Sequence, residues 1–255
     1  MTRIIGIVSG KGGVGKTTFS VNLGIALSYF KKKVLIIDCN ITTPHLAYYL
    51  GVDNYSVNLT NVFRDEVEIK YAPSSHKGVM FIPASEELRD MHIDFEKLKH
   101  YVKRIAKEKD FDFIILDSAP GLGNEATSVL EAAEEVLLVT TPTIPNLTDM
   151  VRCVEYVSGM KYKSIKLVFN MVRKSKSEMK IKDLEKSFDV PILGMVPLSK
   201  DIMDSTALGM PIFDYKPNSK ICHDFMEIAA NLIGIMYKRP SRFRRLIKKL
   251  KSIKR

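Results

Sequence analysis

Residues 3–18 read RIIGIVSGKGGVGKTT, and they carry the strongest indication of the fold. Residues 3–9 are short, apolar and rich in β-branched side chains, which is typical of a buried strand in a parallel sheet. Gly10–Thr17 then matches the pattern G-x-x-x-x-G-K-[ST]. The segment after it has helical periodicity, and its apolar residues fall on one face: Phe19, Leu23, Ala26 and Leu27. A strand, a glycine-rich turn and a helix in this order predict a phosphate-binding loop.

The residue types of this loop suit a nucleoside triphosphate. Glycines let backbone N–H groups surround a phosphate without Cβ clashes, and the following helix adds its partial positive charge. We expect Lys16 to contact the β- and γ-phosphates, Thr17 to hold Mg²⁺ and Thr18 to support the α-phosphate. The alternative, a purely structural turn, is a weaker interpretation of this pattern. The predicted ATP-binding residues of the loop are Gly10, Lys11, Gly12, Gly13, Val14, Gly15, Lys16, Thr17 and Thr18.

Apolar and helical segments alternate along the rest of the chain. Further strands are expected at 34–37, 79–82, 111–116, 136–140, 166–169 and 192–196, and the longer helices at 88–109 and 219–237. This alternation predicts a doubly wound α/β fold, in which a mostly parallel sheet is flanked by helices. Ligands of such sheets bind beyond the carboxyl ends of the strands. We therefore expect one ATPase domain over 1–237, followed by a separate tail over 238–255.

The charge is divided unequally between these two parts. The chain of 255 residues has a formal net charge of +10. Ten of its 39 Lys and Arg residues lie in 238–255, which leaves 29 to balance the 29 Asp and Glu residues of 1–237. The tail therefore carries the whole excess, whereas a general nucleic-acid binder more often spreads its basic surface over the fold. No signal-peptide pattern and no apolar run of about 18 residues is present, so we expect a cytoplasmic protein.

Two carboxylates stand at predicted strand ends. Asp117 ends the strand at 111–116 and fits a residue that holds Mg²⁺, usually through water. Asp38 ends the strand at 34–37 and is a second candidate for the outer shell of the metal. The predicted metal-site residues are thus Thr17, Asp38 and Asp117.

Lys11 is not required by a generic phosphate loop, and at this point the sequence resembles the MinD/ParA family of ATPases. The loop of that family reads KGGVGKTT, as Lys11–Thr18 does here. The resemblance covers about residues 1–237, and its closest branch is MinD, including archaeal-type members. It extends to VLIID at 34–38, DFIILDSAPGLG at 112–123, LLVTTP at 137–142 and GMVPLSKDI at 194–202.

The resemblance implies further roles. ATP would join two copies of the chain into a homodimer in which Lys11 of one copy reaches the phosphates bound by the other. Asn170 would read the adenine, and Pro197 would wall the ring. Asp149 and Arg152 resemble a pair in the dimer and partner helix of the family.

One residue departs from the family pattern. The family has D-x-D at the end of the second strand, whereas this sequence reads Asp38-Cys39-Asn40. Asn40 can hydrogen-bond a water but cannot take its proton as a carboxylate does. Because phosphoryl transfer depends mainly on positioning and electrostatics, hydrolysis is still expected, although slow. The predicted catalytic residues are Lys11, Lys16, Asp38 and Asn40.

The tail has an amphipathic pattern. Its apolar residues share one face of a predicted helix: Phe243, Leu246, Ile247, Leu250 and Ile253. The other face of this helix is nearly all Lys and Arg. Such a helix suits the interface of an anionic membrane, and the MinD branch ends in a tail of this kind. A nucleic-acid-binding tail and a partner-binding helix are the alternatives.

Together these features predict a MinD-like ATPase that uses ATP and Mg²⁺, dimerises on ATP, docks peripherally on the membrane and positions an unidentified partner. Two alternatives remain open. One is a ParA-type partition ATPase whose tail binds DNA, and the other is a nucleotide-gated scaffold with almost no turnover. Iron–sulfur carriers share the fold but need cluster cysteines, and Cys39 and Cys153 do not match their patterns.

Overall fold

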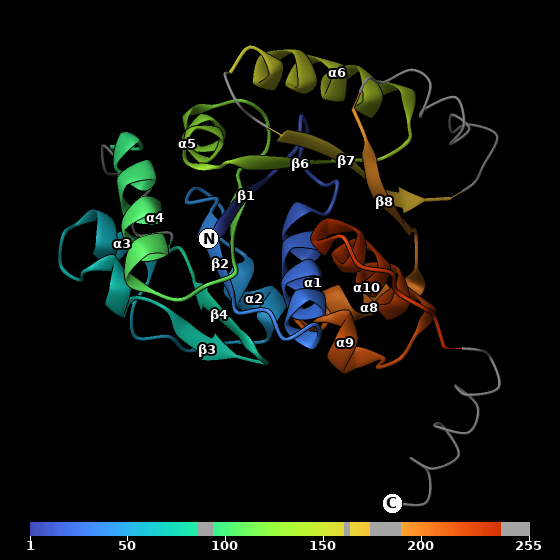
Figure 1. Cartoon of the computed structure of the whole chain (residues 1–255), viewed down its shortest axis with the longest axis horizontal. Helices are drawn as coiled ribbons and strands as arrows, with labels where there is room; N and C mark the ends of the chain where they lie inside the picture. Colours follow the sequence, from blue (N-terminus) through green and yellow to red (C-terminus); the bar gives the residue numbers. More distant parts are fainter. Residues whose placement is uncertain (86–93, 161–163, 174–189, 241–255) are drawn as a thin grey trace, which may run out of the picture.

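One sheet forms the centre of the molecule (Figure 1). The computed structural model describes residues 1–85, 94–160, 164–173 and 190–240. Within these residues the sheet has eight strands in the order β3-β4-β2-β5-β1-β6-β7-β8. Their bounds are β1 Arg3–Val8, β2 Val34–Cys39, β3 Ser74–His76, β4 Val79–Ile82, β5 Phe113–Ser118, β6 Glu135–Thr140, β7 Ser164–Val172 and β8 Ile192–Pro197.

All seven predicted strands are present, and the pairs that they form are parallel. The eighth strand, β3, was not predicted. It pairs with β4 in the antiparallel direction at the edge of the sheet. Its three residues, SSH, have no apolar pattern from which a strand could be predicted. The strand is recognised only by its backbone hydrogen bonds to β4.

Helices cover both faces of the sheet, as Figure 1 shows. Apolar side chains of α4 to α6 pack on one face, and those of α1, α2, α9 and α10 pack on the other, together with part of α8. The predicted doubly wound architecture is therefore confirmed. The helix bounds are α1 Lys16–Tyr29, α2 Leu46–Leu50, α3 Leu59–Phe63, α4 Glu96–Glu108, α5 Asn124–Ala132, α6 Ile144–Ser158, α8 Lys200–Ala207, α9 Ile212–Tyr215 and α10 Lys220–Ile233, with a 3₁₀ turn η1 at Ile69–Tyr71.

The helix after the phosphate loop is more deeply buried than its pattern suggests. Every residue from Phe19 to Leu27 is buried, and not only those on one face. The reason is that α10 covers the side of α1 that faces away from the sheet, where the rings of Phe19 and Phe225 lie 5.9 Å apart. This layer fixes the axis of α1, and with it the loop that precedes the helix.

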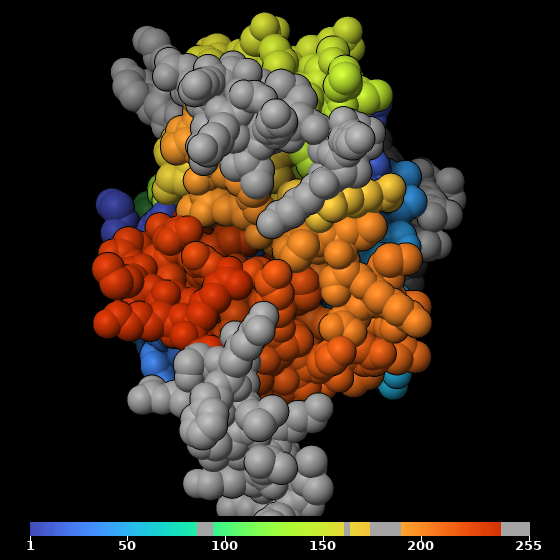
Figure 2. All heavy atoms as spheres, turned by 90° about the vertical axis from the view of Figure 1, so that its right-hand side faces the viewer, coloured from blue at the N-terminus to red at the C-terminus, as the bar shows by residue number. Residues whose placement is uncertain are grey.

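Two helix boundaries differ from the sequence prediction. Of the helix expected at 88–109, residues 88–93 lie outside the described part, and the helix begins at Glu96, where the Asp94 carboxylate accepts the Glu96 backbone N–H at 3.2 Å. The helix expected at 219–237 ends at Ile233, because Gly234 takes a left-handed conformation with φ 72°. The chain then continues to Pro240 along the side of the molecule seen in Figure 2, where β8 to Pro240 form the orange and red surface.

None of the helices in the described ranges has the length and apolarity of a membrane span. The predicted membrane-binding residues of the tail lie outside the described residues: Phe243, Leu246, Ile247, Leu250 and Ile253.

Candidate functional site

The phosphate loop borders a hollow at the carboxyl edge of the sheet. The loop connects β1 to α1, and Gly13 (φ 75°) and Gly15 (φ 86°) take left-handed conformations that favour glycine. The hollow has a volume of about 260 Å³ and brings together three segments that are far apart in the sequence. They contribute Gly12, Gly13, Gly15, Lys16, Thr17 and Thr18; Asn40, Thr43, His45 and Tyr49; and Ser118 and Pro120.

Close packing behind the loop explains two of its glycines. A Cβ at Gly10 would lie 2.8 Å from Cβ of Asp149, on α6. A Cβ at Gly15 would lie 2.5 Å from Nδ2 of Asn170, on β7. Both distances are shorter than real Cβ contacts, so the loop keeps its shape only with glycine at these positions.

Lys16 is held inside the loop. Its side chain is buried, and Nζ donates to the Ser9 hydroxyl at 2.9 Å. That hydroxyl in turn donates to the Lys11 carbonyl at 2.7 Å. Burial lowers the pKa of Lys16, and the charge of Asp117 opposes the shift. The ammonium group of Lys16 is thus held inside the loop, where it can donate charge-assisted hydrogen bonds to a bound phosphate.

Asp117 has the environment of a metal ligand. It is fully buried, and its Oδ1 accepts the Ser20 hydroxyl at 2.8 Å, whereas Oδ2 has no hydrogen-bond partner of good geometry among the described residues. Burial raises the pKa of Asp117, and the nearby hydroxyls of Thr17 and Ser20 and the charge of Lys16 oppose the rise. A buried carboxylate oxygen beside the Thr17 hydroxyl fits Mg²⁺, which takes few protein ligands and completes its shell with water and phosphate oxygens.

Asp38 has a different local role. Both of its oxygens accept backbone N–H groups: Oδ1 from Asn40 at 3.1 Å, and Oδ2 from His45 at 3.1 Å and Leu46 at 3.0 Å. Burial and the charge of Asp117 raise the pKa of Asp38 to about 8. The carboxylate therefore fixes the loop between β2 and α2. A role in the outer shell of the metal stays a prediction.

Asn40 lies at the mouth of the hollow and stabilises a turn. Its Nδ2 donates to the Thr43 carbonyl at 2.6 Å, and its Oδ1 accepts the Thr43 hydroxyl at 3.2 Å. The same carbonyl receives Nδ1 of His45 at 2.8 Å. The catalytic role predicted for Asn40 stays a prediction, and in this arrangement its amide group already has two partners in the turn.

Lys11 forms an ion pair within its own chain. Its Nζ lies 2.9 Å from Oδ2 of Asp149, and a nitrogen of Arg152 lies 3.7 Å from Oδ1 of the same carboxylate. The side chains of Lys11 and Arg152 are exposed. The three residues that the sequence linked to a dimer therefore form one cluster at the open side of the loop.

A second, apolar cavity of about 390 Å³ adjoins the phosphate hollow and shares Gly13, Gly15, Thr18 and Tyr49 with it. Pro197 and Asn170 line it, together with apolar residues that the prediction did not name: Met171, Leu198, Ile202, Met203 and Ala207. The adenine contacts expected of Pro197 and Asn170 stay a prediction. Nδ2 of Asn170 donates to the Val14 carbonyl at 2.7 Å, so Asn170 also supports the phosphate loop.

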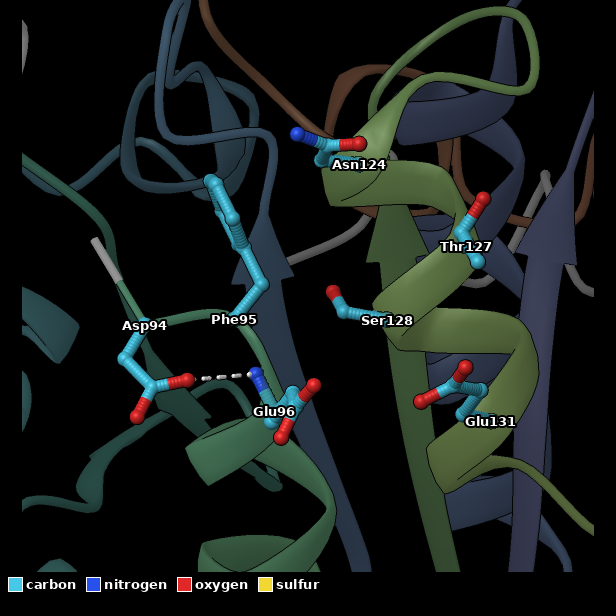
Figure 3. Close-up of a pocket in the computed structure, with 7 residues that line it drawn as sticks. All are labelled: Asp94, Phe95, Glu96, Asn124, Thr127, Ser128 and Glu131. Carbon is cyan, nitrogen blue, oxygen red and sulfur yellow. Dashed lines mark hydrogen bonds between the residues drawn. The ribbon is translucent and has the colours of Figure 1, made fainter. Parts of the chain in front are cut away.

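Another hollow, of about 350 Å³, lies between α4 and α5 (Figure 3). Phe95 points toward Asn124 at the start of α5, and Asp94 bonds to the backbone of Glu96. It contains none of the predicted ATP-binding residues. We do not count it as part of the candidate site.

The sequence analysis missed several residues of the site, among them His45, Tyr49 and Ser20. His45 and Tyr49 line the phosphate hollow, and Ser20 bonds to Asp117. Ser20 lies one helical turn after Lys16, so the spacing contained a signal for it. His45 and Tyr49 follow a loop of irregular conformation, and no periodicity indicates which way they point.

The chain is similar to several known proteins. The family model described as "ParA: NUBPL iron-transfer P-loop NTPase" matches residues 1–233. An uncharacterized ATP-binding protein of Methanocaldococcus jannaschii is 32% identical over 239 residues, which are 93% of this chain and 90% of that protein. The crystal structure of the cell division ATPase MinD of Pyrococcus furiosus has a TM-score of 0.85 at 34% identity and covers 92% of this chain and 99% of its own. The structure of the septum site-determining protein MinD of Pyrococcus horikoshii, complexed with Mg-ADP, has a TM-score of 0.83 at 33% identity. The match covers 91% of this chain and 96% of that one.

Proposed function

Because this chain belongs to the ParA/MinD family of P-loop NTPases, we propose that it is a MinD-like ATPase that switches between a free and a membrane-bound state. It binds ATP with Mg²⁺ in the hollow of the phosphate loop. The observation that carries the proposal is the joint placement of Lys16, Thr17 and Asp117 beneath this loop, with Lys11 exposed at its open side.

ATP brings two copies of the chain together in this proposal. Lys11 leaves Asp149 and reaches the phosphates bound by the second copy. Two observations support this step. The side chain of Lys11 is about half exposed, and Arg152, 3.7 Å from the other oxygen of Asp149, stays beside this carboxylate when Lys11 leaves it. The neighbouring α6 also presents exposed apolar residues, Ile144 and Val151, which suit a protein interface.

Membrane docking takes place through residues 241–255. Each Lys or Arg near an anionic leaflet contributes about 1 kcal/mol, and salt weakens this attraction. One short tail is therefore marginal, whereas two tails on an ATP dimer gain about 10²- to 10⁴-fold in effective affinity. The root of the tail is fixed on the body, since Arg239 lies 2.7 Å from Asp224 and also pairs with Glu227.

Hydrolysis ends the membrane-bound state. We expect it to be slow, because Asn40 stands where the family has a second Asp, and an amide does not accept a proton. The long-lived dimer on the cytoplasmic face of the membrane positions a partner protein, such as a component of the division site or another membrane-associated cargo.

An iron-transfer function, which the description of the family model names, is not proposed. Cys39, Cys153 and Cys222 are each buried as free thiols. In the described ranges no group of three or more His, Cys, Asp or Glu side chains could hold a metal ion.

The test is flotation with vesicles that contain an anionic phospholipid. Full-length protein and a chain truncated after Pro240 are compared, each with ATP and with ADP. Two point variants place the same new charge on opposite faces of the predicted tail helix: Leu246→Glu on the apolar face and Ser252→Glu on the basic face. We expect flotation to need both ATP and the tail, and to be lost with Leu246→Glu but largely kept with Ser252→Glu.

Other outcomes favour the alternatives. If DNA competes the protein off the vesicles, and both Glu variants weaken binding equally, the basic tail acts as in a partition ATPase. If ATP and the tail both support flotation but no phosphate is released, the protein is a nucleotide-gated scaffold. If flotation depends neither on the nucleotide nor on the tail, the proposal of a membrane switch is wrong.

A further inference from the structure

The turn between β2 and α2 fixes the tautomer of His45. The carbonyl oxygen of Thr43 accepts hydrogen bonds, and Nδ1 of His45 lies 2.8 Å from it. A carbonyl oxygen cannot donate, so Nδ1 must carry the hydrogen in the neutral imidazole. Nε2 of the same ring therefore keeps its lone pair and is an acceptor.

His45 lines the hollow of the phosphate loop and also a neighbouring hollow on the side of Asp38 and Tyr48. Its ring lines the hollow together with Lys16 and Thr17, its side chain is exposed, and Nε2 forms no hydrogen bond within the described part of the chain. The ring is also fixed in place. The His45 backbone N–H donates to Asp38 at 3.1 Å, and the ring stacks on Tyr49 with the centroids 6.1 Å apart.

Asn40 is less suited to hold a water here. Its Nδ2 and Oδ1 are both engaged with Thr43, at 2.6 and 3.2 Å. Each polar atom of the Asn40 side chain thus already forms one bond in the turn, although Oδ1 keeps a second lone pair. Nε2 of His45, by contrast, forms no hydrogen bond to any described residue.

We infer that Nε2 of His45 accepts a hydrogen bond from the water that attacks the γ-phosphorus of ATP, and so orients that water. The inference deepens the proposed ATPase function and rests on it. In the step, the water oxygen forms a bond to the γ-phosphorus while the bond from this phosphorus to the bridging oxygen breaks, and the electron pair of that bond leaves with ADP. One water proton passes to a γ-phosphoryl oxygen, so the imidazole stays neutral. Such a role is consistent with phosphoryl transfer, in which an amide side chain can orient the water in other enzymes.

The competing explanation is that His45 only stabilises its turn through Nδ1. Two substitutions separate the two nitrogens. His45→Asn places an amide near Nδ1 and can still bond to Thr43, but it has nothing at the position of Nε2. His45→Gln reaches the position of Nε2 with its side-chain oxygen and loses the contact to Thr43.

The experiment measures single-turnover ATP hydrolysis, and separately the ATP affinity, of the full chain and these variants. His100→Asn is the matched control, because His100 is exposed on α4 and lines none of the cavities at the site. We expect His45→Asn to slow hydrolysis about 100-fold, and His45→Gln to lose less than about 10-fold. ATP affinity should be unchanged in both, and His100→Asn should behave as the wild type.

A second measurement does not depend on activity. The ¹⁵N chemical shifts of the neutral form of the His45 ring in the nucleotide-free protein should identify Nδ1 as the nitrogen that carries the hydrogen and Nε2 as the one that does not. The opposite tautomer would overturn the inference, because Nε2 would then be a donor.

The outcomes also separate this inference from the proposed function. If the wild type hydrolyses ATP and His45→Asn does so equally fast, His45 is structural and the ATPase function stands. If His45→Gln is the slower of the two variants, the turn and not Nε2 matters. If the wild type shows no turnover at all, both the inference and the proposed hydrolysis are wrong, while ATP binding is tested by the affinity measurement alone.

Discussion

Asp38 and Asp117 are register partners on the neighbouring strands β2 and β5, so their two buried carboxylates lie side by side beneath the phosphate loop. Burial raises the pKa of both, and for Asp38 the charge of Asp117 adds to the effect. Two adjacent carboxylates without water need a cation to remain ionised together. We therefore expect the stability of the nucleotide-free protein to depend on pH, and the binding of ATP to depend on Mg²⁺.

The first prediction concerns the pH dependence of stability. Burial and the charge of Asp117 raise the pKa of Asp38 from its ordinary value of 3.8 to about 8 in the folded state, so the folded state holds this proton more tightly. Its contribution to stability is complete below the unfolded pKa and is lost as the pH rises toward about 8. The melting temperature of the protein free of nucleotide and metal should therefore fall between about pH 5 and pH 8 by more than that of Asp38→Asn. Parallel curves for the two proteins would mean that Asp38 does not titrate in this way.

The second prediction concerns Mg²⁺. Asp117→Asn removes the charge next to the unpaired oxygen, so Mg²⁺ should no longer strengthen ATP binding. We expect the ratio of ATP affinities with and without Mg²⁺, measured by calorimetry, to fall at least about 10-fold. Asp110→Asn is the control, since Asp110 is exposed and pairs with Lys33 outside the site. An unchanged ratio in Asp117→Asn would mean that Asp117 does not hold the Mg²⁺ ion.

The third prediction concerns the dimer. Lys11 pairs with Asp149 and lines neither of the two cavities, so its loss should leave the binding of ATP to a single chain almost intact. We expect Lys11→Ala to abolish the ATP-dependent dimer in light-scattering measurements, because in the proposed dimer Lys11 is the residue that contacts the partner's phosphates. Lys107→Ala, on the exposed side of α4, is the matched control. A Lys11→Ala protein that still dimerises on ATP would contradict the role given to Lys11.

The fourth prediction separates two roles of Asn170. Its Nδ2 supports the Val14 carbonyl in the phosphate loop, and the resemblance also assigns it the reading of adenine. In Asn170→Ala the contact with the loop is lost. The binding of ATP analogues and of GTP analogues should therefore weaken equally, by about 1 kcal/mol or about fivefold in affinity. An additional loss for the ATP analogue alone would support adenine reading, and an effect on neither would exclude both roles.

The main features of the sheet could be predicted because they depend on local composition. Each parallel strand is a short apolar run such as Val34–Cys39, and burial on both faces demands such runs. The loop could be predicted because Gly13, Gly15 and Lys16 each satisfy a specific requirement of backbone or charge. By contrast, β3 exists only through its pairing with β4, and α10 ends at Gly234 through a backbone conformation that the apolar pattern does not encode.

The site was predicted less completely than the fold. Asp117 and Thr17 follow from strand ends and motif spacing, but the contacts of Asp38 with His45 and Leu46 arise from the path of an irregular loop. The same loop places His45 in the lining of the phosphate hollow. No periodic pattern determines such a path, so the side chains that it places are found only in three dimensions.

The last prediction concerns Asn40, whose amide stands where the family resemblance implies a carboxylate. In Asn40→Asp the carboxylate cannot donate to the Thr43 carbonyl, so the bond of 2.6 Å is lost, and we expect the melting temperature to fall by about 2–4 °C. The same carboxylate can accept a proton from water, so single-turnover hydrolysis should rise at least about 10-fold. Asn40→Ala loses the same bond without adding a base, and it should therefore lower the melting temperature without raising the rate. If Asn40→Asp hydrolyses ATP no faster than the wild type, the slow turnover does not arise from Asn40. If Asn40→Ala is as fast as Asn40→Asp, loosening of the turn and not proton transfer limits the reaction.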